Sequence, residues 1–217
     1  MATHRAPEEL KERILQGTMR LVAAGGMSNF SFPKLSAETG ISAPTVYEYF
    51  KNKEDLLSSC FMKIDTEVSS LVAKILQTIP AHVNEPEKIN DYCWLLWNVY
   101  WRFLLADADR TLFYWSFYNS EYYNARVLEK RLHNFEAFLG FVDQVDLRFS
   151  ISEKQNAQLL VANMLDNTVS TAVKVLRGQY PNDASTVNTV YRMVFYPILS
   201  FFGFATEPNS APPSLPQ

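Results

Sequence analysis

The stretch from Ser36 to Leu56, SAETGISAPTVYEYFKNKEDL, decides how the first part of the chain folds. Gly40 divides it into two short runs that favour helix, and glycine is the common residue where a helix ends in a left-handed turn. Ser42 stands before the second run, where a serine side chain caps the free N–H groups of the first turn. Ser31 takes the same place before the first run. The sequence therefore predicts two short helices joined by a tight turn.

The rest of the chain is predicted to be helical as well, which makes the fold class all-α. The chain has only 7 glycines among 217 residues, and its apolar residues recur at helical spacing rather than in the alternation of a strand. Proline, glycine and capping residues divide it into about nine helices. Besides the two short ones, the expected helices span residues 7–25, 53–79, 87–105, 110–118, 120–145, 152–177 and 184–202.

The composition is that of an ordinary globular protein, with no overall bias toward nucleic acid or membrane. Hydrophobic residues make up 47% and charged residues 20%, and the formal net charge is -3. Acidic and basic side chains balance over residues 1–56, so any DNA-binding charge has to be local.

The longest apolar stretch, from Val194 to Ala205, is shorter than the ~20 residues of a membrane span. The start of the chain also lacks the apolar core of a signal peptide, and a cytoplasmic protein with no membrane partner is expected.

No pattern of catalytic or metal-binding side chains stands out. Cys60 and Cys93 lie far apart, and neither has a second Cys or a His at metal-ligand spacing. Both are expected to be buried free thiols of a reducing compartment. There is no HExxH motif, glycine-rich phosphate loop, paired-carboxylate motif or Ser-His-Asp set. We therefore expect no enzyme activity, no cofactor and no metal.

Two short helices joined by a glycine-containing turn form the helix-turn-helix geometry. In that geometry the second helix enters the major groove with its N-terminal residues at the base edges, while the first lies over the DNA backbone. Serine, threonine and tyrosine hydroxyls reach phosphates, and Lys53 at the start of the next helix adds a positive charge. The pattern favours double-stranded DNA as a partner, although a plain helical hairpin with surface tyrosines would show the same turn.

The stretch FSFPKLSAETGISAPTVYEYFKNKEDLL, from Phe30 to Leu57, resembles the DNA-binding motif of the TetR family of transcriptional repressors. The resemblance is strong from about Glu9 to Phe61, and beyond that it rests on the order and lengths of the helices. It implies that one helix-capping serine contacts phosphate, that the start of the second short helix reads base edges, and that the tyrosines and the following lysine contact the backbone. The expected DNA-binding residues are Ser31, Lys34, Ser42, Ala43, Pro44, Thr45, Tyr47, Tyr49 and Lys53.

The second short helix departs from the usual pattern, because it has no Arg, Lys, Asn or Gln for a bidentate base contact. Base reading is expected to depend on thymine-methyl contacts from Ala43, Pro44 and Thr45, on Lys34, and on DNA shape. Because these side chains are missing, an alternative stays open, namely that the chain is a helical ligand-binding or adaptor protein that has lost sequence-specific DNA binding.

The region from Asp91 to Tyr123 holds more aromatic side chains than one face of a helix can carry. They form either a bulky core or the lining of a cavity for a hydrophobic or aromatic small molecule, and in the TetR family the effector pocket lies in this half. Arg102 is expected to pair with Asp166, to hold an anionic ligand or to face solvent. The expected ligand-binding residues are Trp97, Trp101, Arg102, Phe113, Phe117, Phe138, Asn163, Asp166 and Asn167.

The last two helices carry more apolar surface than one partner helix can cover, which favours a two-fold homodimer. The resemblance implies a four-helix bundle, and such a dimer would place two recognition helices about 34–36 Å apart on a palindromic operator. The expected interface residues are Leu160, Met164, Val173, Val190, Val194, Phe195, Ile198, Phe201 and Phe202.

Together these patterns predict a ligand-responsive DNA-binding transcriptional regulator. It is expected to be a repressor that a small hydrophobic or aromatic effector releases from a palindromic operator. The expected domains are a helix-turn-helix DNA-binding domain at 1–55, a ligand-binding and dimerisation domain at 56–204 and a disordered proline-rich tail at 205–217. The helix at 53–79 connects the first two.

Overall fold

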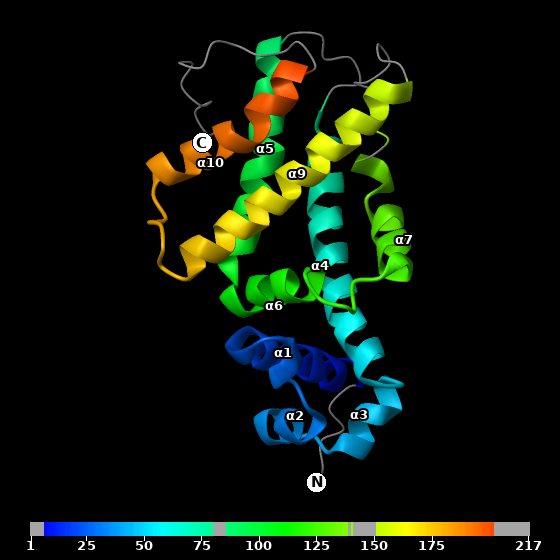
Figure 1. Cartoon of the computed structure of the whole chain (residues 1–217). Coiled ribbons are helices and arrows are strands. Elements are labelled where there is room, and N and C mark those ends of the chain that lie inside the picture. Colours follow the sequence, from blue (N-terminus) through cyan, green and yellow to red (C-terminus); the bar gives the residue numbers. More distant parts are fainter. Residues whose placement is uncertain (1–6, 80–85, 139, 141–150, 202–217) are drawn as a thin grey trace. The chain divides into compact units, whose positions relative to one another are not determined.

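The computed structural model describes residues 7–79, 86–138, 140 and 151–201, and every regular element among them is a helix (Figure 1). The expected all-α fold class is confirmed. None of these helices has the apolar length that crossing a bilayer requires. The elements are α1 (Pro7–Gly25), the 3-10 turn η1 (Met27–Asn29), α2 (Phe32–Thr39), α3 (Ala43–Tyr49), α4 (Lys53–Leu76), α5 (Pro86–Ala106), α6 (Ala108–Tyr118), α7 (Ala125–Asn134), α9 (Ile151–Leu176) and α10 (Ala184–Phe201).

One helix begins later than the sequence indicates. The helix expected over 120–145 starts at Ala125, because the residues before it form a turn. The Ser120 hydroxyl donates back to the carbonyl oxygen of Phe117 at 2.7 Å instead of capping a helix. Asn124 takes the capping role, since its side-chain oxygen accepts a hydrogen bond from the backbone N–H of Val127 at 3.2 Å. Residues 141–145 of that expected helix, Phe202 and the tail at 205–217 lie outside the described residues.

Contacts divide the chain into two compact units. Unit 1 consists of residues 1–67 and 107–134, and unit 2 consists of residues 68–106 and 135–217. Unit 1 therefore holds α1, α2, α3, the first part of α4, α6 and α7. Unit 2 holds the end of α4 together with α5, α9 and α10. The DNA-binding domain expected at 1–55 falls within unit 1.

Three helices, α1, α2 and α3, form a small head within unit 1. Ile14, Leu35 and Val46 are completely buried in its core, and burial of each such side chain contributes about 1.5–3 kcal/mol. α1 approaches α2 closely at Gly17, where an added Cβ would lie 2.3 Å from the Cγ2 atom of Thr39. The absence of a side chain at this glycine therefore sets the spacing between α1 and α2.

Unit 2 is built around the tryptophans of α5. Trp94 and Trp97 pack against Tyr191 of α10, with ring centroids 4.8 and 5.4 Å apart, and Trp97 stacks on Trp101 at 5.4 Å. The indole N–H of Trp97 donates to the hydroxyl of Thr168 on α9 at 3.1 Å. This hydrogen bond satisfies a buried donor and ties α5 to α9.

Candidate nucleic-acid interface

The α2–turn–α3 segment has the helix-turn-helix geometry that the sequence predicts (Figure 1). Ser31 caps α2 by accepting a hydrogen bond from the backbone N–H of Lys34 at 3.4 Å. Ser42 caps α3 in the same way, accepting from Thr45 at 3.4 Å. Gly40 ends α2 in the left-handed conformation, with φ 70° and ψ 12°, which glycine adopts without strain. Both predicted caps and the predicted turn are confirmed.

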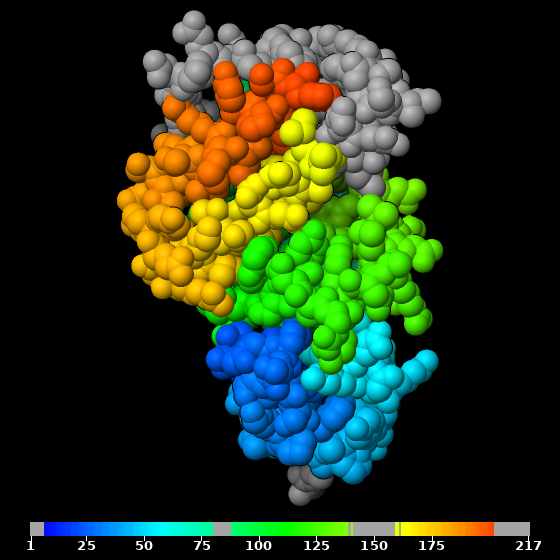
Figure 2. All heavy atoms as spheres, viewed as in Figure 1, coloured from blue at the N-terminus to red at the C-terminus, as the bar shows by residue number. Residues whose placement is uncertain are grey.

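The residues expected to contact DNA are exposed or half-buried, and Figure 2 shows the surface of the segment that carries them in blue to cyan. Leu35, Val46 and Phe50 are buried, and this fixes which faces of α2 and α3 point outward. Tyr47 is 52% exposed. Among the expected DNA-binding residues, Lys34, Ser42, Pro44 and Tyr47 are exposed, and Ser31, Ala43, Thr45, Tyr49 and Lys53 are half-buried.

The ring of Tyr47 rests on a row of aromatic side chains. Its centroid lies 4.8 Å from that of Phe32, and Phe32 meets the buried Phe30 edge to face at 5.7 Å. Contacts between rings restrict the orientation of Tyr47 while leaving its hydroxyl end at the surface. A tyrosine held in this way can present its hydroxyl to a DNA phosphate.

The start of α3 offers mainly apolar groups to a base edge. The hydroxyls of Ser42 and Thr45 hydrogen-bond to each other at 2.9 Å. The other groups at this end are the methyl of Ala43, the ring of Pro44 and the Thr45 methyl. Such groups suit the C5-methyl of thymine, whereas guanine is usually read by a bidentate Arg or Lys.

Positive charge in this segment is sparse. Between residues 31 and 56 the basic side chains are Lys34, Lys51 and Lys53. The ammonium of Lys34 is hydrogen-bonded to the side-chain oxygen of Asn29, and Lys53 is the first residue of α4. Each phosphate that a protein neutralises steepens the salt dependence of DNA binding. Because this segment has few basic side chains, DNA binding through it should have a shallow salt dependence.

Comparison with known proteins assigns this segment to a family. The sequence model described as "Bacterial regulatory proteins, tetR family" matches residues 14–60, which include the whole α2–turn–α3 segment. Over these residues the chain is similar to the TetR family. An uncharacterized HTH-type transcriptional regulator of Haemophilus influenzae is 29% identical to it over 99 residues, which are 46% of this chain and 49% of that relative. The match thus spans about half the length of this curated relative.

Solved structures of TetR family proteins share the fold over most of the chain. A TetR family transcription regulator from Marinobacter aquaeolei has a TM-score of 0.69 and 18% identity, covering 87% of this chain and 94% of its own. FadR from Bacillus subtilis, crystallised in complex with stearoyl-CoA, has a TM-score of 0.61 and 18% identity, covering 84% and 96%. The family model and these similar proteins are described as regulators rather than as enzymes.

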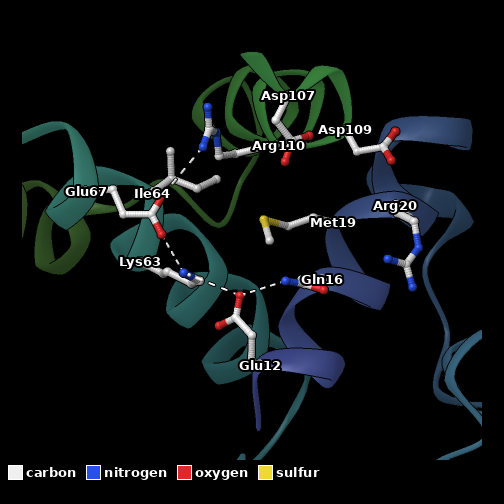
Figure 3. Close-up of a pocket in the computed structure, with 10 residues that line it drawn as sticks. All are labelled: Glu12, Gln16, Met19, Arg20, Lys63, Ile64, Glu67, Asp107, Asp109 and Arg110. Carbon is white, nitrogen blue, oxygen red and sulfur yellow. Dashed lines mark hydrogen bonds and ion pairs between the residues drawn. The ribbon is translucent and has the colours of Figure 1, made fainter. Parts of the chain in front are cut away.

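Unit 1 also contains a polar pocket of about 380 Å³ between α1, α4 and α6 (Figure 3). Lys63 of α4 lies 3.5 Å from Glu12 of α1 and is hydrogen-bonded to Glu67, whose carboxylate lies 3.7 Å from Arg110 of α6. Burial alone would lower the pKa of Lys63, but its hydrogen bond with Glu67 and the two nearby carboxylates raise it. These ion pairs join the head to α6. Sequence reasoning missed them, although the i,i+4 spacing of Lys63 and Glu67 was an available signal.

The residues expected to bind an effector are divided between the two units of the TetR fold. Phe113 and Phe117 belong to α6 in unit 1, where Phe117 stacks on Phe61 at 4.7 Å. Trp97 and Trp101 belong to the core of unit 2. Within unit 2, Phe138 and Asp166 are half-buried, and Arg102, Asn163 and Asn167 are exposed.

Two buried donors in unit 2 have no acceptor among the residues that the structure describes. They are the indole N–H groups of Trp94 and Trp101 on α5. Leaving a buried donor unsatisfied costs about 1–3 kcal/mol. A ligand with a hydrogen-bond acceptor would remove that cost. Sequence reasoning did not select Trp94, because the aromatic run does not reveal which face of α5 is buried.

Most residues expected at a dimer interface are buried within their own subunit. Pairing of α9 and α10 covers much of their apolar surface. Among the side chains of these helices whose burial the structure describes, the large hydrophobic ones that stay exposed are Leu159 at 67%, Met193 at 55% and Tyr196 at 41%. Among the expected residues, Met164, Val173, Val190, Val194, Phe195 and Ile198 are buried, Leu160 and Phe201 are half-buried, and Phe202 lies outside the described residues.

Proposed function

We propose that this protein is a homodimeric, cytoplasmic DNA-binding transcriptional repressor of the TetR family, which a small hydrophobic or aromatic effector releases from a palindromic operator. The observation that carries the proposal is the surface of the helix-turn-helix. There Thr45 and Tyr47 project from α3 while Val46 between them is buried. The geometry suits insertion of α3 into a major groove.

The proposed contacts divide into two kinds. Ser31, Tyr47, Tyr49 and Lys53 bind phosphates and set the register of the protein on the duplex. The small apolar groups at the start of α3 contact thymine methyls, which gives a modest preference that DNA shape supplements. Ser42 and Lys34 add contacts at the edge of this surface.

The proposed effector site lies in the aromatic part of the chain. Its support is the density of rings around Trp97 and Trp101. A second support is the indole N–H groups of Trp94 and Trp101, which have no acceptor within the part of the chain that the structure describes. An acyl chain is bound by one protein of the same fold, FadR, whose crystal structure contains stearoyl-CoA. An effector with a large apolar body and at least one acceptor atom suits these groups. It can release DNA only to the extent that it prefers the non-binding state.

Selection of binding sites from randomised duplex DNA tests the proposal. The purified protein is incubated with the library at a stated salt concentration, and bound duplexes are recovered and sequenced over several rounds. The proposal predicts enrichment of a palindrome with half-sites about one helical turn, 10–10.5 bp, apart. Hydrophobic and aromatic compounds are then screened for release of the selected duplex. A helical adaptor without DNA binding would enrich no sequence.

A further inference from the structure

The ammonium group of Lys53, at the start of α4, lies between two aromatic rings. Its Nζ atom is 5.6 Å from the centroid of Phe30 and 5.6 Å from the centroid of Tyr122. Both distances are within the range in which a cation is attracted to the face of a ring. A flexible lysine side chain has many rotamers, and contacts on two sides remove most of that freedom.

The two rings come from different parts of unit 1. Phe30 is buried next to α2 and packs edge to face on Phe32, so the first ring belongs to the DNA-binding head. Tyr122 belongs to the loop between α6 and α7, residues 119–124. The same loop reaches the first turn of α4 a second time, because the side-chain N–H of Asn124 donates to Glu54 at 3.2 Å.

The loop around Tyr122 is held by its own hydrogen bonds. The backbone N–H of Tyr122 donates to the hydroxyl of Ser120 at 3.3 Å, and its carbonyl oxygen accepts from Asn124 at 3.1 Å. The next residue, Tyr123, packs against Phe61 of α4 at 5.6 Å. Its hydroxyl accepts a hydrogen bond from Arg131 of α7 at 3.1 Å. Tyr122 is thus carried by a fixed loop rather than by a mobile one.

We propose that Tyr122 is a positioning residue for DNA binding, which holds the ammonium of Lys53 against Phe30 and toward the DNA backbone. The inference rests on the proposed function, because it assigns Lys53 to a phosphate. Tyr122 itself touches no DNA in this scheme. It acts by restricting Lys53 before the duplex arrives, so the entropic cost of ordering that side chain is not paid on binding.

A double-mutant cycle on the full-length protein tests the positioning role. Affinities are measured by fluorescence anisotropy for a duplex selected by the wild-type protein from a randomised library. Tyr122→Leu should weaken binding roughly 2- to 5-fold, the scale of an exposed cation–π contact. Tyr122→Phe keeps the ring and should bind like wild type. In a Lys53→Met background Tyr122→Leu should cause no further loss, whereas an equal loss in both backgrounds, or a loss in neither, would overturn the proposal.

A second measurement separates this inference from the proposed function, because it needs no DNA. In protein labelled with 13C-lysine, the ε-methylene protons of Lys53, assigned with Lys53→Arg, should be shifted upfield by the ring currents of two rings. The shift should shrink in Tyr122→Leu, persist in Tyr122→Phe and persist in Tyr180→Leu, a matched change at an exposed tyrosine of unit 2. A Lys53 resonance at the position of an exposed lysine would overturn the inference. A shifted resonance in a protein that enriches no duplex would contradict only the proposed function.

Discussion

Arg131 of α7 lies with its Nε atom 3.3 Å from the carboxylate of Asp65 on α4, and that carboxylate is completely buried. Tyr114 of α6 donates to the same group at 3.3 Å, and Asn134 of α7 donates at 3.2 Å. Burial raises the pKa of Asp65, while the charge of Arg131 and the hydrogen bonds oppose that rise. One buried carboxylate therefore ties three helices of unit 1 together.

Asp65→Asn should lower the free energy of unfolding by about 3–5 kcal/mol, because it leaves the guanidinium of Arg131 without its buried partner. Equilibrium unfolding in urea measures this loss. Asp109→Asn, at an exposed position of α6, is the matched control and should stay within about 0.5 kcal/mol of wild type. A loss of less than about 1 kcal/mol at Asp65 would show that the network does not hold unit 1 together.

Gly17→Ala should destabilise the head by about 1–3 kcal/mol, although alanine is the better helix former. The new methyl would lie 2.3 Å from the Cγ2 atom of Thr39. Thr39 cannot turn aside, because its hydroxyl donates to the Leu35 carbonyl at 2.7 Å and accepts from Ile41 at 3.2 Å. Thr39→Ser removes the clashing methyl and keeps the hydroxyl, so it should restore most of the stability in the double variant. An additive loss in thermal unfolding would refute this explanation.

The head could be predicted from the sequence because its determinants are local. Ser31, Gly40 and Ser42 each act within four residues, through a cap or a left-handed turn, and the structure confirms all three. The start of α7 could not be predicted equally well. Ser120 and Asn124 are both capping residues, and which of them opens the helix depends on the contact of Asn124 with Glu54, far away in the sequence.

The effector and interface residues were harder to predict, because they depend on which face of each helix is covered. Val190, Val194 and Ile198 of α10 are apolar and could have faced a second subunit, but they are buried within their own. The aromatic residues between Asp91 and Tyr123 form one cluster in the sequence, but the fold divides them between two units. Composition indicates that these aromatic rings have to be buried, but only the packed structure shows which elements bury them.

Cys93 should react slowly with iodoacetamide in the folded protein. The residue is half-buried, desolvation raises the pKa of its thiol to about 12, and only the thiolate is the nucleophile. Relative to an ordinary thiol of pKa 9.0, the thiolate fraction at pH 8 falls about a thousandfold. The alkylation rate of a Cys60→Ala variant, followed by mass spectrometry at pH 8, should rise by about that factor in concentrated urea. Equal rates in buffer and in urea would contradict the raised pKa of this half-buried thiol.

Tyr47→Phe and Thr45→Ala should change DNA binding in different ways. Loss of the Tyr47 hydroxyl would remove the proposed phosphate contact, so affinity should fall by a similar factor, about 2- to 10-fold, for the selected and for random duplexes. Thr45→Ala removes a methyl at the start of α3, so it should change which bases are enriched. Thr45→Val keeps that methyl and should keep the preference. Identical effects of the two changes on both duplexes would contradict this division of roles.

Met193→Glu and Tyr196→Glu should convert the proposed dimer to monomers. Both side chains are exposed on α10. Burying such apolar groups in an interface is favourable, whereas burying an unpaired carboxylate in their place is costly. Sedimentation velocity at micromolar concentration measures the change. Tyr180→Glu introduces the same charge at another exposed tyrosine and should leave the dimer intact. A wild-type protein that sediments as a monomer would refute the interface.

The central claim, that the surface of α3 reads a DNA sequence, is tested most directly by a ratio of two affinities. The dissociation constants for the selected duplex and for a scrambled duplex of equal length and base composition are measured side by side at one salt concentration. We expect the selected duplex to bind at least about tenfold more tightly, which is the modest preference that thymine-methyl contacts and DNA shape would give. Equal affinity for both duplexes, or no binding to either at low ionic strength, would contradict the claim.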